Sequence, residues 1–219
     1  AVADRQKRFP RDRDLMMALA TLYASMRRYE RTLNIYFEMK HPDIFGLIEQ
    51  RRLFGAVKDK ILGLCVIDED KALRLLAAHT DEIEVGHVKV HLQSNRTLLF
   101  RYLDEVATRN MRAVRGVQDM MVELYAECGP EKLETFLRRS TDVNLDAALS
   151  VCRKHKLWAC VVFCLEKIGG DHNHIEALDI LIKRLHQVDR AIDFVRTVGG
   201  GQLWPELVAK AAHRDRKSV

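Results

Sequence analysis

The chain has 219 residues, of which 31% are charged and 47% hydrophobic, a composition typical of a folded protein and incompatible with intrinsic disorder. The longest apolar run, residues 157–165, is far shorter than the ~20 residues of a membrane-spanning helix. The N-terminus is polar and basic, so we expect no signal peptide. Five cysteines, without the spacing of a disulfide scaffold, favour a reducing, cytoplasmic location.

The net charge of +5 raises the question of nucleic-acid binding. Residues 1–14 carry five basic and three acidic side chains, and residues 210–219 carry four and one. From the totals of 36 and 31, residues 15–209 therefore keep 27 of each sign and are neutral. A phosphate-binding surface needs basic side chains clustered on the folded body. A nucleic-acid-binding helical repeat thus remains only an alternative.

Apolar residues recur with the period of an α-helix in segment after segment, and no strand pattern replaces it. Such sets occur at Leu19, Leu22, Tyr23 and Met26; at Leu145, Ala148, Leu149 and Cys152; and at Val188, Ala191, Ile192 and Val195. Glycine (11 residues) and proline (4) are scarce, as expected of a helical chain.

In chain order, the pattern predicts helices over about 15–27, 29–40, 43–50 and 53–66, then one that Asp68 caps. Residues 81–95 fit either a short helix or an extended segment. Ser94 can cap a helix to about residue 108, and another covers about 114–127. After the helix start at Gly129-Pro130-Glu131, helices follow at about 131–138, 144–154, 156–168, 174–186, 188–198 and 202–212.

These roughly thirteen helices, joined by short turns, predict an all-α fold: an α-solenoid of stacked antiparallel helical hairpins. Through its residues 19–23 and 29–36, the first hairpin resembles a tetratricopeptide-type pair. We expect a flexible basic lead-in at 1–14, a single solenoid at 15–212 and a basic tail at 213–219. A helical stack usually offers surface to partner proteins, so a scaffold is favoured over an enzyme.

His41-Pro42-Asp43 is the signature tripeptide of J-domain cochaperones. In a J-domain a polar, lysine-rich loop follows, whereas here residues 44–48 resume an apolar helix at once. We therefore interpret the tripeptide as a turn.

Cys160, Cys164, His172 and His174 are four potential zinc ligands within fifteen residues. Zinc sites more often use a Cys-x2-Cys knuckle in a polar loop, whereas these cysteines lie one helical turn apart among apolar residues. We interpret them as core residues and predict no metal site.

No other constellation predicts catalysis or cofactor binding. Residues 199–201, three glycines, lack the Lys-Ser/Thr of a phosphate loop and are interpreted as a turn. Cys152 and His155 could meet on a helix, but no orienting acid accompanies them. The acidic pairs at 81–82 and 104–105 are interpreted as solvated surface. The remaining aromatic candidates, Tyr23, Tyr29, Tyr36, Trp158 and Trp204, are predicted to be core residues rather than interface anchors.

Several short sequence segments within residues 15–209 together resemble a known family. They are residues 29–36, 41–48, 57–61, 124–127, 136–141, 188–194 and 203–207. In their order and spacing they resemble the helical region of the vacuolar protein sorting-associated protein forty-one family. The ending, residues 213–219, departs from the family pattern.

The resemblance implies a clathrin heavy-chain-type repeat and a non-enzymatic segment of a subunit of the HOPS complex, which tethers vesicles and late endosomes to vacuoles or lysosomes. It implies that the partners are other HOPS subunits, and it leaves open whether the solenoid also associates with itself. It implies no cofactor and no small-molecule substrate. Membrane association would be indirect, through the complex, on late endosome, lysosome or vacuole membranes. The same repeat in clathrin heavy chain or another tethering subunit is the nearest alternative. The family's β-propeller and RING-like zinc module are absent from this sequence.

Overall fold

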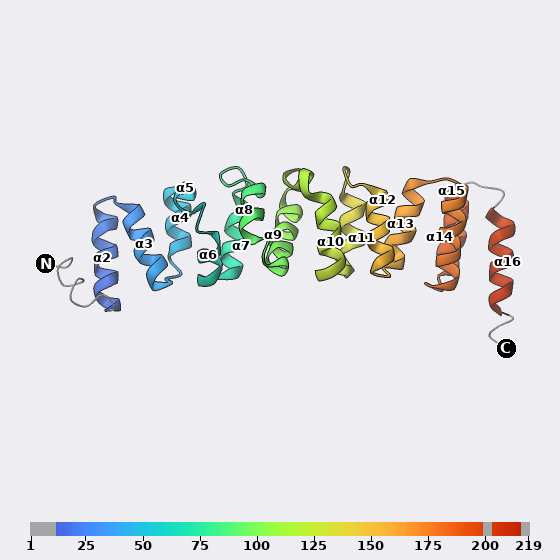
Figure 1. The fold of residues 1–219 in the computed structure, drawn as a ribbon, viewed down its shortest axis with the longest axis horizontal. Helices are drawn as coiled ribbons and strands as arrows, with labels where there is room; N and C mark the ends of the chain where they lie inside the picture. Colours follow the sequence, from blue (N-terminus) through green and yellow to red (C-terminus); the bar gives the residue numbers. More distant parts are fainter. Residues whose placement is uncertain (1–11, 199–202, 216–219) are drawn as a thin grey trace. The chain divides into compact units, whose positions relative to one another are not determined.

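The computed structural model describes residues 12–198 and 203–215, with side chains to residue 209, and its regular structure there is entirely helical (Figure 1). This confirms the predicted all-α class. The first helices are α2 (Arg13–Ser25), α3 (Tyr29–Met39), α4 (Ile44–Arg51), α5 (Phe54–Val57), α6 (Ile61–Ile67), α7 (Glu69–Ala78), α8 (Val85–Leu92) and α9 (Arg96–Arg109). After a 3-10 segment, Met111–Val117, come α10 (Gln118–Cys128), α11 (Pro130–Arg139), α12 (Leu145–Lys154), α13 (Trp158–Ile168), α14 (Asp171–Lys183), α15 (Val188–Val198) and α16 (Leu203–Asp215).

The contacts group the chain into two compact units, divided between Val114 and Arg115. In the first unit, α2 packs on α3, α3 on α4 and α6, and α4 on α7. The helices α6, α7, α8 and α9 then pack on one another in the same way. Each helix thus contacts helices close to it in sequence, as in stacked hairpins.

The second unit is built by the same rule. Here α10 packs on α11 and α12, α11 and α12 both pack on α13, and α13 packs on α14. The helices α14, α15 and α16 contact one another. Within each unit the helices form stacked antiparallel hairpins, which is the predicted α-solenoid arrangement (Figure 1).

Polar contacts tie neighbouring helices together beside the apolar core. The buried Thr32 hydroxyl on α3 donates to the Ala20 carbonyl of α2, at 3.3 Å. On the surface, Arg101 of α9 reaches Glu69 and Asp70 of α7, and Arg153 of α12 donates to both carboxylate oxygens of Glu176 on α14 at 2.7 Å. These pairs join helices of successive hairpins.

Among the described residues, five turns that follow a helix contain a residue in the left-handed conformation that is not glycine. At or just after the C-terminus of a helix, φ lies between 50° and 58° at Arg27, Lys40, Arg52, Lys156 and His186. Glycine is the usual residue at such a position because it has no Cβ. Four of these side chains are Arg or Lys, and a positive charge interacts favourably with the negative end of the helix dipole.

Several helix boundaries differ from the predicted ones. The single helix expected over 53–66 is interrupted, because a turn at residues 58–60 separates α5 from α6. The cap of α9 is Asn95 rather than Ser94, since the Asn95 side chain accepts the Leu98 amide at 3.1 Å. The ambiguous stretch 81–95 contains the helix α8, which covers Val85–Leu92.

The ends of the described structure differ from the predicted lead-in and tail. The helix α2 begins at Arg13, inside the predicted lead-in, and Asp12 caps it by accepting the amides of Asp14 and Leu15. Residues 1–11 and 216–219 of the predicted lead-in and tail lie outside the described residues, as does the glycine turn at 199–201.

The predicted apolar face of α2 is only partly a core face. Leu19 is buried at 2% exposure, but Leu22 and Met26 are 45% and 51% exposed, so only part of the apolar face is covered. The reason is that α2 packs principally on one helix, α3, and shares with it a small core of Met16, Leu19, Ala20 and Ile35.

Candidate functional site

His41, Pro42 and Asp43 form the turn between α3 and α4, as predicted. The Asp43 amide donates to His41 Nδ1 at 3.3 Å, and the His41 ring stacks on Tyr36 with the ring centroids 5.2 Å apart. The helix α4 begins at the next residue, Ile44. Because the histidine is held by its own turn and by Tyr36, the local structure explains the tripeptide without a cochaperone role.

The cysteines of the predicted zinc candidate lie in the core of the second unit. Cys160 and Cys164 are 4% and 0% exposed on α13, and Cys152 of α12 hydrogen-bonds to both thiols. These hydrogen bonds and burial raise the pKa of Cys152, which keeps it a thiol and disfavours a nucleophilic role beside His155.

The histidines of that candidate point elsewhere. His174 packs edge-on against Phe194, with the ring centroids 5.8 Å apart, and His172 is exposed. Among the described residues, the side chains of a different group, Asp59, His87 and His91, lie close enough together to hold a metal ion.

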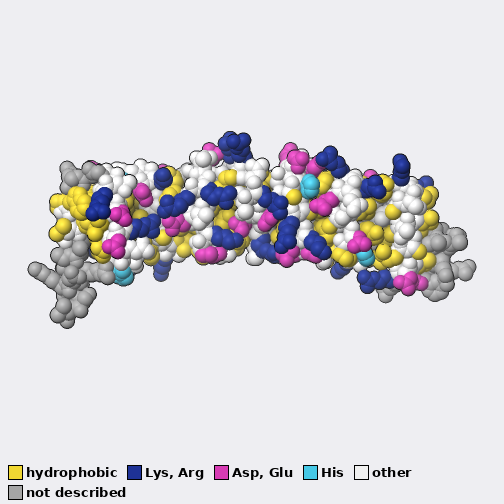
Figure 2. Space-filling model, turned by 180° about the vertical axis from the view of Figure 1, so that it is seen from behind, with side chains coloured by type: hydrophobic (Ala, Val, Ile, Leu, Met, Phe, Trp, Pro, Cys, Tyr) yellow, Lys and Arg dark blue, Asp and Glu magenta, His cyan; other side chains and the backbone are white. Residues whose placement is uncertain are grey.

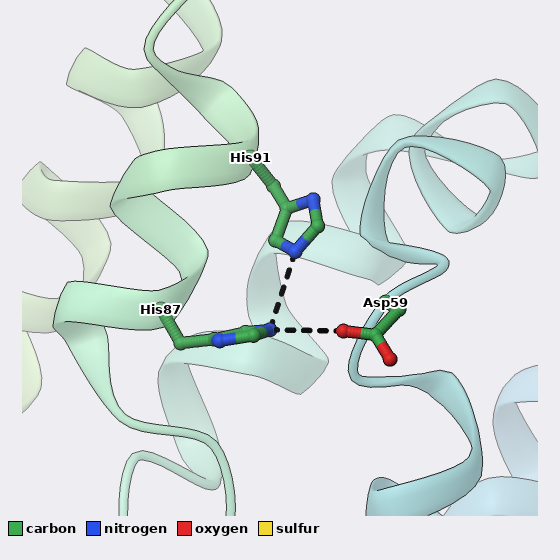
Figure 3. A group of neighbouring side chains, drawn as sticks. All are labelled: Asp59, His87 and His91. Carbon is green, nitrogen blue, oxygen red and sulfur yellow. Dashed lines mark hydrogen bonds and ion pairs between the residues drawn. The ribbon is translucent and has the colours of Figure 1, made fainter.

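These three residues come together in the first unit (Figure 3). His87 and His91 lie one turn apart on α8, and Asp59 lies in the turn between α5 and α6. Their nearest ligand atoms all lie within 4.8 Å of one another. His87 Nε2 is 3.2 Å from His91 Nε2, 3.6 Å from an Asp59 carboxylate oxygen and 3.1 Å from the Lys58 carbonyl oxygen.

The contacts of this group favour one arrangement of its hydrogens. The Lys58 carbonyl can only accept, so its contact with His87 is a hydrogen bond in the tautomer that carries the hydrogen on Nε2, and in that tautomer His91 Nε2 faces the same hydrogen with a lone pair. The group is accessible from solvent, since the His87 side chain is 28% exposed and Asp59 is 85% exposed. Two imidazoles and one carboxylate thus converge on one point at the surface.

Sequence reasoning missed this group. A His-x3-His spacing is informative only on a helix, where it places two side chains on one face about 6 Å apart; on a strand the same spacing gives about 13 Å. The stretch containing both histidines fitted either conformation. Asp59 is 28 positions before His87, so only the packing of α6 on α8 brings it close.

The exposed aromatic and aliphatic side chains are candidates for protein contact. Trp204 is 41% exposed, so its predicted core position was wrong: it lies one turn before the exposed Val208 on α16. Trp158 is half-buried beneath the guanidinium of Arg184, 5.3 Å from its ring. In the first unit, Leu62 and Val66 on α6 are 49% and 63% exposed, and Val90 on the adjacent α8 is 57% exposed.

Tyr23, Tyr29 and Tyr36 border the core and are not fully buried. Tyr23 and Tyr36 pack against the small core that α2 shares with α3, and the Arg51 guanidinium lies 4.7 Å from the Tyr29 ring centre. On the face shown in Figure 2, basic and acidic side chains intermingle, in keeping with the neutral body inferred from the sequence. Within the described residues, no helix is both long and apolar enough to form a membrane span.

Comparison with known proteins identifies the family. The family model of the Vps41 TPR-like region matches residues 1–217. This chain belongs to that family. Vacuolar protein sorting-associated protein 41 homologs of Mus musculus and Homo sapiens are each 33% identical to it over 208 residues, or 95% of this chain and 24% of theirs. The homolog of Solanum lycopersicum is 34% identical over 206 residues, covering 91% of this chain and 21% of its own.

The chain therefore spans about a quarter of the length of these curated relatives. No solved structure matches it. The resemblance inferred from the sequence is confirmed, and the stacked helices are the Vps41 TPR-like region of this chain.

Proposed function

We propose that this chain is a non-enzymatic scaffold and protein-interaction segment of a HOPS tethering-complex subunit. In this role it acts in vesicle-mediated transport and fusion at the vacuole or lysosome. The observation that carries the proposal is the match of almost the whole chain to the Vps41 TPR-like region. Its relatives are vacuolar protein sorting-associated protein 41 homologs, and this supports a role in vacuolar sorting.

The mechanism is geometric. Because each helix packs on helices near it in sequence, a stack of hairpins holds its ends apart and presents long lateral faces to partners. We propose residues 15–212 as one such solenoid, working in the cytoplasm on late endosome, lysosome or vacuole membranes. Its contact with the membrane is indirect, through the complex.

The second unit supports a structural role for the cysteines that could have suggested an enzyme. Cys152 is fully buried, and its raised pKa opposes thiolate formation. The geometry of the described residues thus gives no reason to assign a reaction to Cys152. We propose that the chain is not an enzyme.

The test uses the tagged 219-residue chain as bait in extracts of its source cells, with quantitative mass spectrometry of what co-purifies. Three baits are compared: the wild type, a Leu62→Ser/Val66→Ser variant, and a Glu82→Ser/Glu84→Ser control. Each pair of substitutions removes exposed side chains of the first unit, apolar in one case and acidic in the other. A second, differently tagged copy of the chain reports self-association.

We expect the other HOPS subunits to be enriched with the wild type and the control, and reduced several-fold with the α6 variant. If the α6 variant recovered as much of the HOPS subunits as the wild type, the contact would lie on another face. Absence of HOPS subunits from the wild-type sample would overturn the proposal. Recovery of ribonucleoproteins that disappear after nuclease treatment would favour the nucleic-acid alternative instead.

A further inference from the structure

We propose that Asp59, His87 and His91 form a binding site for a divalent transition-metal ion of the zinc class. The site lies on the first unit, between the helix α8 and the turn that precedes α6 (Figure 3). The three side chains supply two imidazole nitrogens and one carboxylate oxygen.

Two of the three distances between donor atoms match those of a tetrahedral site. Ligand atoms about 2.0–2.2 Å from a tetrahedral zinc ion are about 3.3–3.6 Å from one another. His87 Nε2 lies 3.2 Å from His91 Nε2 and 3.6 Å from an Asp59 oxygen. The Asp59 carboxylate is 85% exposed, so its rotation can close the third side without moving the backbone.

The hydrogens of the two imidazoles are compatible with metal binding. A metal needs a lone pair on each Nε2, whereas a His87 Nε2 that donates to the Lys58 carbonyl carries a hydrogen. A shift of His87 to its other neutral tautomer moves this hydrogen to Nδ1 and frees the lone pair of Nε2, so no proton has to leave the protein. The ion then lies between the two Nε2 atoms, and water completes the fourth position.

The donor set selects the class of metal. Imidazole nitrogen suits zinc and the neighbouring first-row ions, whereas Mg²⁺ and Ca²⁺ prefer all-oxygen sites. The nearby Lys60 ammonium does not compete, because it is held 2.8 Å from the Asn34 amide oxygen. The single carboxylate also offsets part of the ion's charge.

Binding would change how two segments of the first unit are joined. His87 Nε2 now contacts the Lys58 carbonyl oxygen at 3.1 Å and an Asp59 carboxylate oxygen at 3.6 Å, both in the turn between α5 and α6. A metal would take the Nε2 lone pair, so the contact with Lys58 would be exchanged for coordination bonds that join Asp59 to His87 and His91 on α8. This turn leads directly into α6, which carries the exposed Leu62 and Val66. The ion therefore acts as a clip that orders the start of that surface helix.

Binding is measured on the 219-residue chain under reducing conditions by calorimetric titration with Zn²⁺, and by Co²⁺ absorption as a report on the ligands. The ligand variants are Asp59→Asn, His87→Gln and His91→Gln. The matched control is His172→Gln/His174→Gln, which removes the two histidines of the other candidate site. Thermal melts with and without Zn²⁺ give a readout independent of the titration, because a ligand of the native state raises Tm.

We expect one Zn²⁺ per chain, a Tm that rises with Zn²⁺ and not with Mg²⁺, and tetrahedral Co²⁺ bands without a thiolate charge-transfer band. Each ligand variant should weaken binding by at least about tenfold, since even outer-sphere partners contribute 10–100-fold. The control should bind as the wild type does.

Unchanged affinity in Asp59→Asn and His91→Gln would overturn the proposal, as would loss of binding in the His172/His174 control. A thiolate charge-transfer band would place the ion on cysteines and overturn it as well. Asp59→Asn keeps the test decisive even if a histidine variant misfolds, because the Asp59 side chain is almost fully in solvent.

Discussion

At the scale of single residues, Tyr102 is the most informative position in the core. Its side chain is fully buried on α9, and its hydroxyl has no hydrogen-bond partner within the described part of the chain. An unpaired buried hydroxyl costs about 1–3 kcal/mol of desolvation, so the ring stabilises the fold while the hydroxyl opposes it.

Tyr102→Phe should therefore raise the free energy of unfolding, by about 1 kcal/mol, because it removes the unpaired group and keeps the ring. Urea denaturation of the two proteins measures the difference. Tyr102→Ala is the control and should cost about 3–5 kcal/mol through lost packing. A clear loss of stability in Tyr102→Phe would show that the hydroxyl has a partner after all.

Tyr102 also predicts a loss of stability in alkali. Burial raises the pKa of Tyr102 above its usual value near 10. In the unfolded chain the phenol ionises near pH 10, so above that pH the unfolded state binds fewer protons than the folded one. The free energy of unfolding should thus fall as pH rises above about 10, and Tyr102→Phe should fall less steeply. Equal slopes in denaturation at pH 9 to 11 would contradict this prediction.

Leu149 tests whether the predicted face of α12 is a core face. Leu149 is 7% exposed, and Leu149→Asp would place an unpaired charge there, at a cost of several kcal/mol. The control is Ser150→Asp, one position along, where the side chain is exposed. Thermal melts compare the two variants, and a wild-type-like curve for Leu149→Asp would refute the assignment of this face.

At the scale of elements, the helix ends decide how much of this fold the sequence predicts. Residues that favour a helix start stand at three positions: Pro130 in a first turn, and the N-caps Asp68 and Asn144. The helices there begin close to the predicted positions. The turn at residues 58–60, between α5 and α6, contains neither glycine nor proline, so the local sequence does not predict it.

The same limit applies to the candidate metal site. His87 and His91 share a face only because α8 is helical, and Asp59 joins them only through packing. The sequence pattern around residues 81–95 did not decide between helix and extended chain, so the local signal was present and could not be interpreted. The prediction that Trp204 is a core residue was wrong for a different reason. Periodicity shows that a helix has an apolar side, but not whether another helix covers that side.

The left-handed turn residues allow a sharp test of the hairpin ends. Lys156 follows α12 with a φ of 58°, a conformation that costs a residue with a Cβ about 1 kcal/mol or more. Lys156→Gly should therefore stabilise the chain by about 0.5–1 kcal/mol. The control is Lys154→Gly, the last residue of the same helix, which should destabilise it by a similar amount. Both changes remove one positive charge, so urea denaturation isolates the effect of the backbone; equal shifts in the two variants would contradict it.

At the scale of the whole molecule, packing between helices near in sequence implies that damage stays local. Stability in such a stack is approximately a sum of repeat and nearest-neighbour terms, so a weakened hairpin opens without unfolding distant ones. The division of contacts between Val114 and Arg115 makes the two units the natural places to look for this behaviour.

Leu149→Ala and Leu73→Ala form a matched pair for this test. Leu149 is buried on α12 of the second unit and Leu73 is buried on α7 of the first, and either change should cost about 2–5 kcal/mol locally. Native-state hydrogen exchange should show that Leu149→Ala speeds exchange in α11 to α14 and leaves α2 to α4 near wild type. Leu73→Ala should give the reverse pattern, with faster exchange in α6 to α9 and little change in α14. If either variant sped exchange equally throughout both units, the chain would be unfolding as one cooperative body, and a scaffold built from locally stable hairpins would be the wrong description.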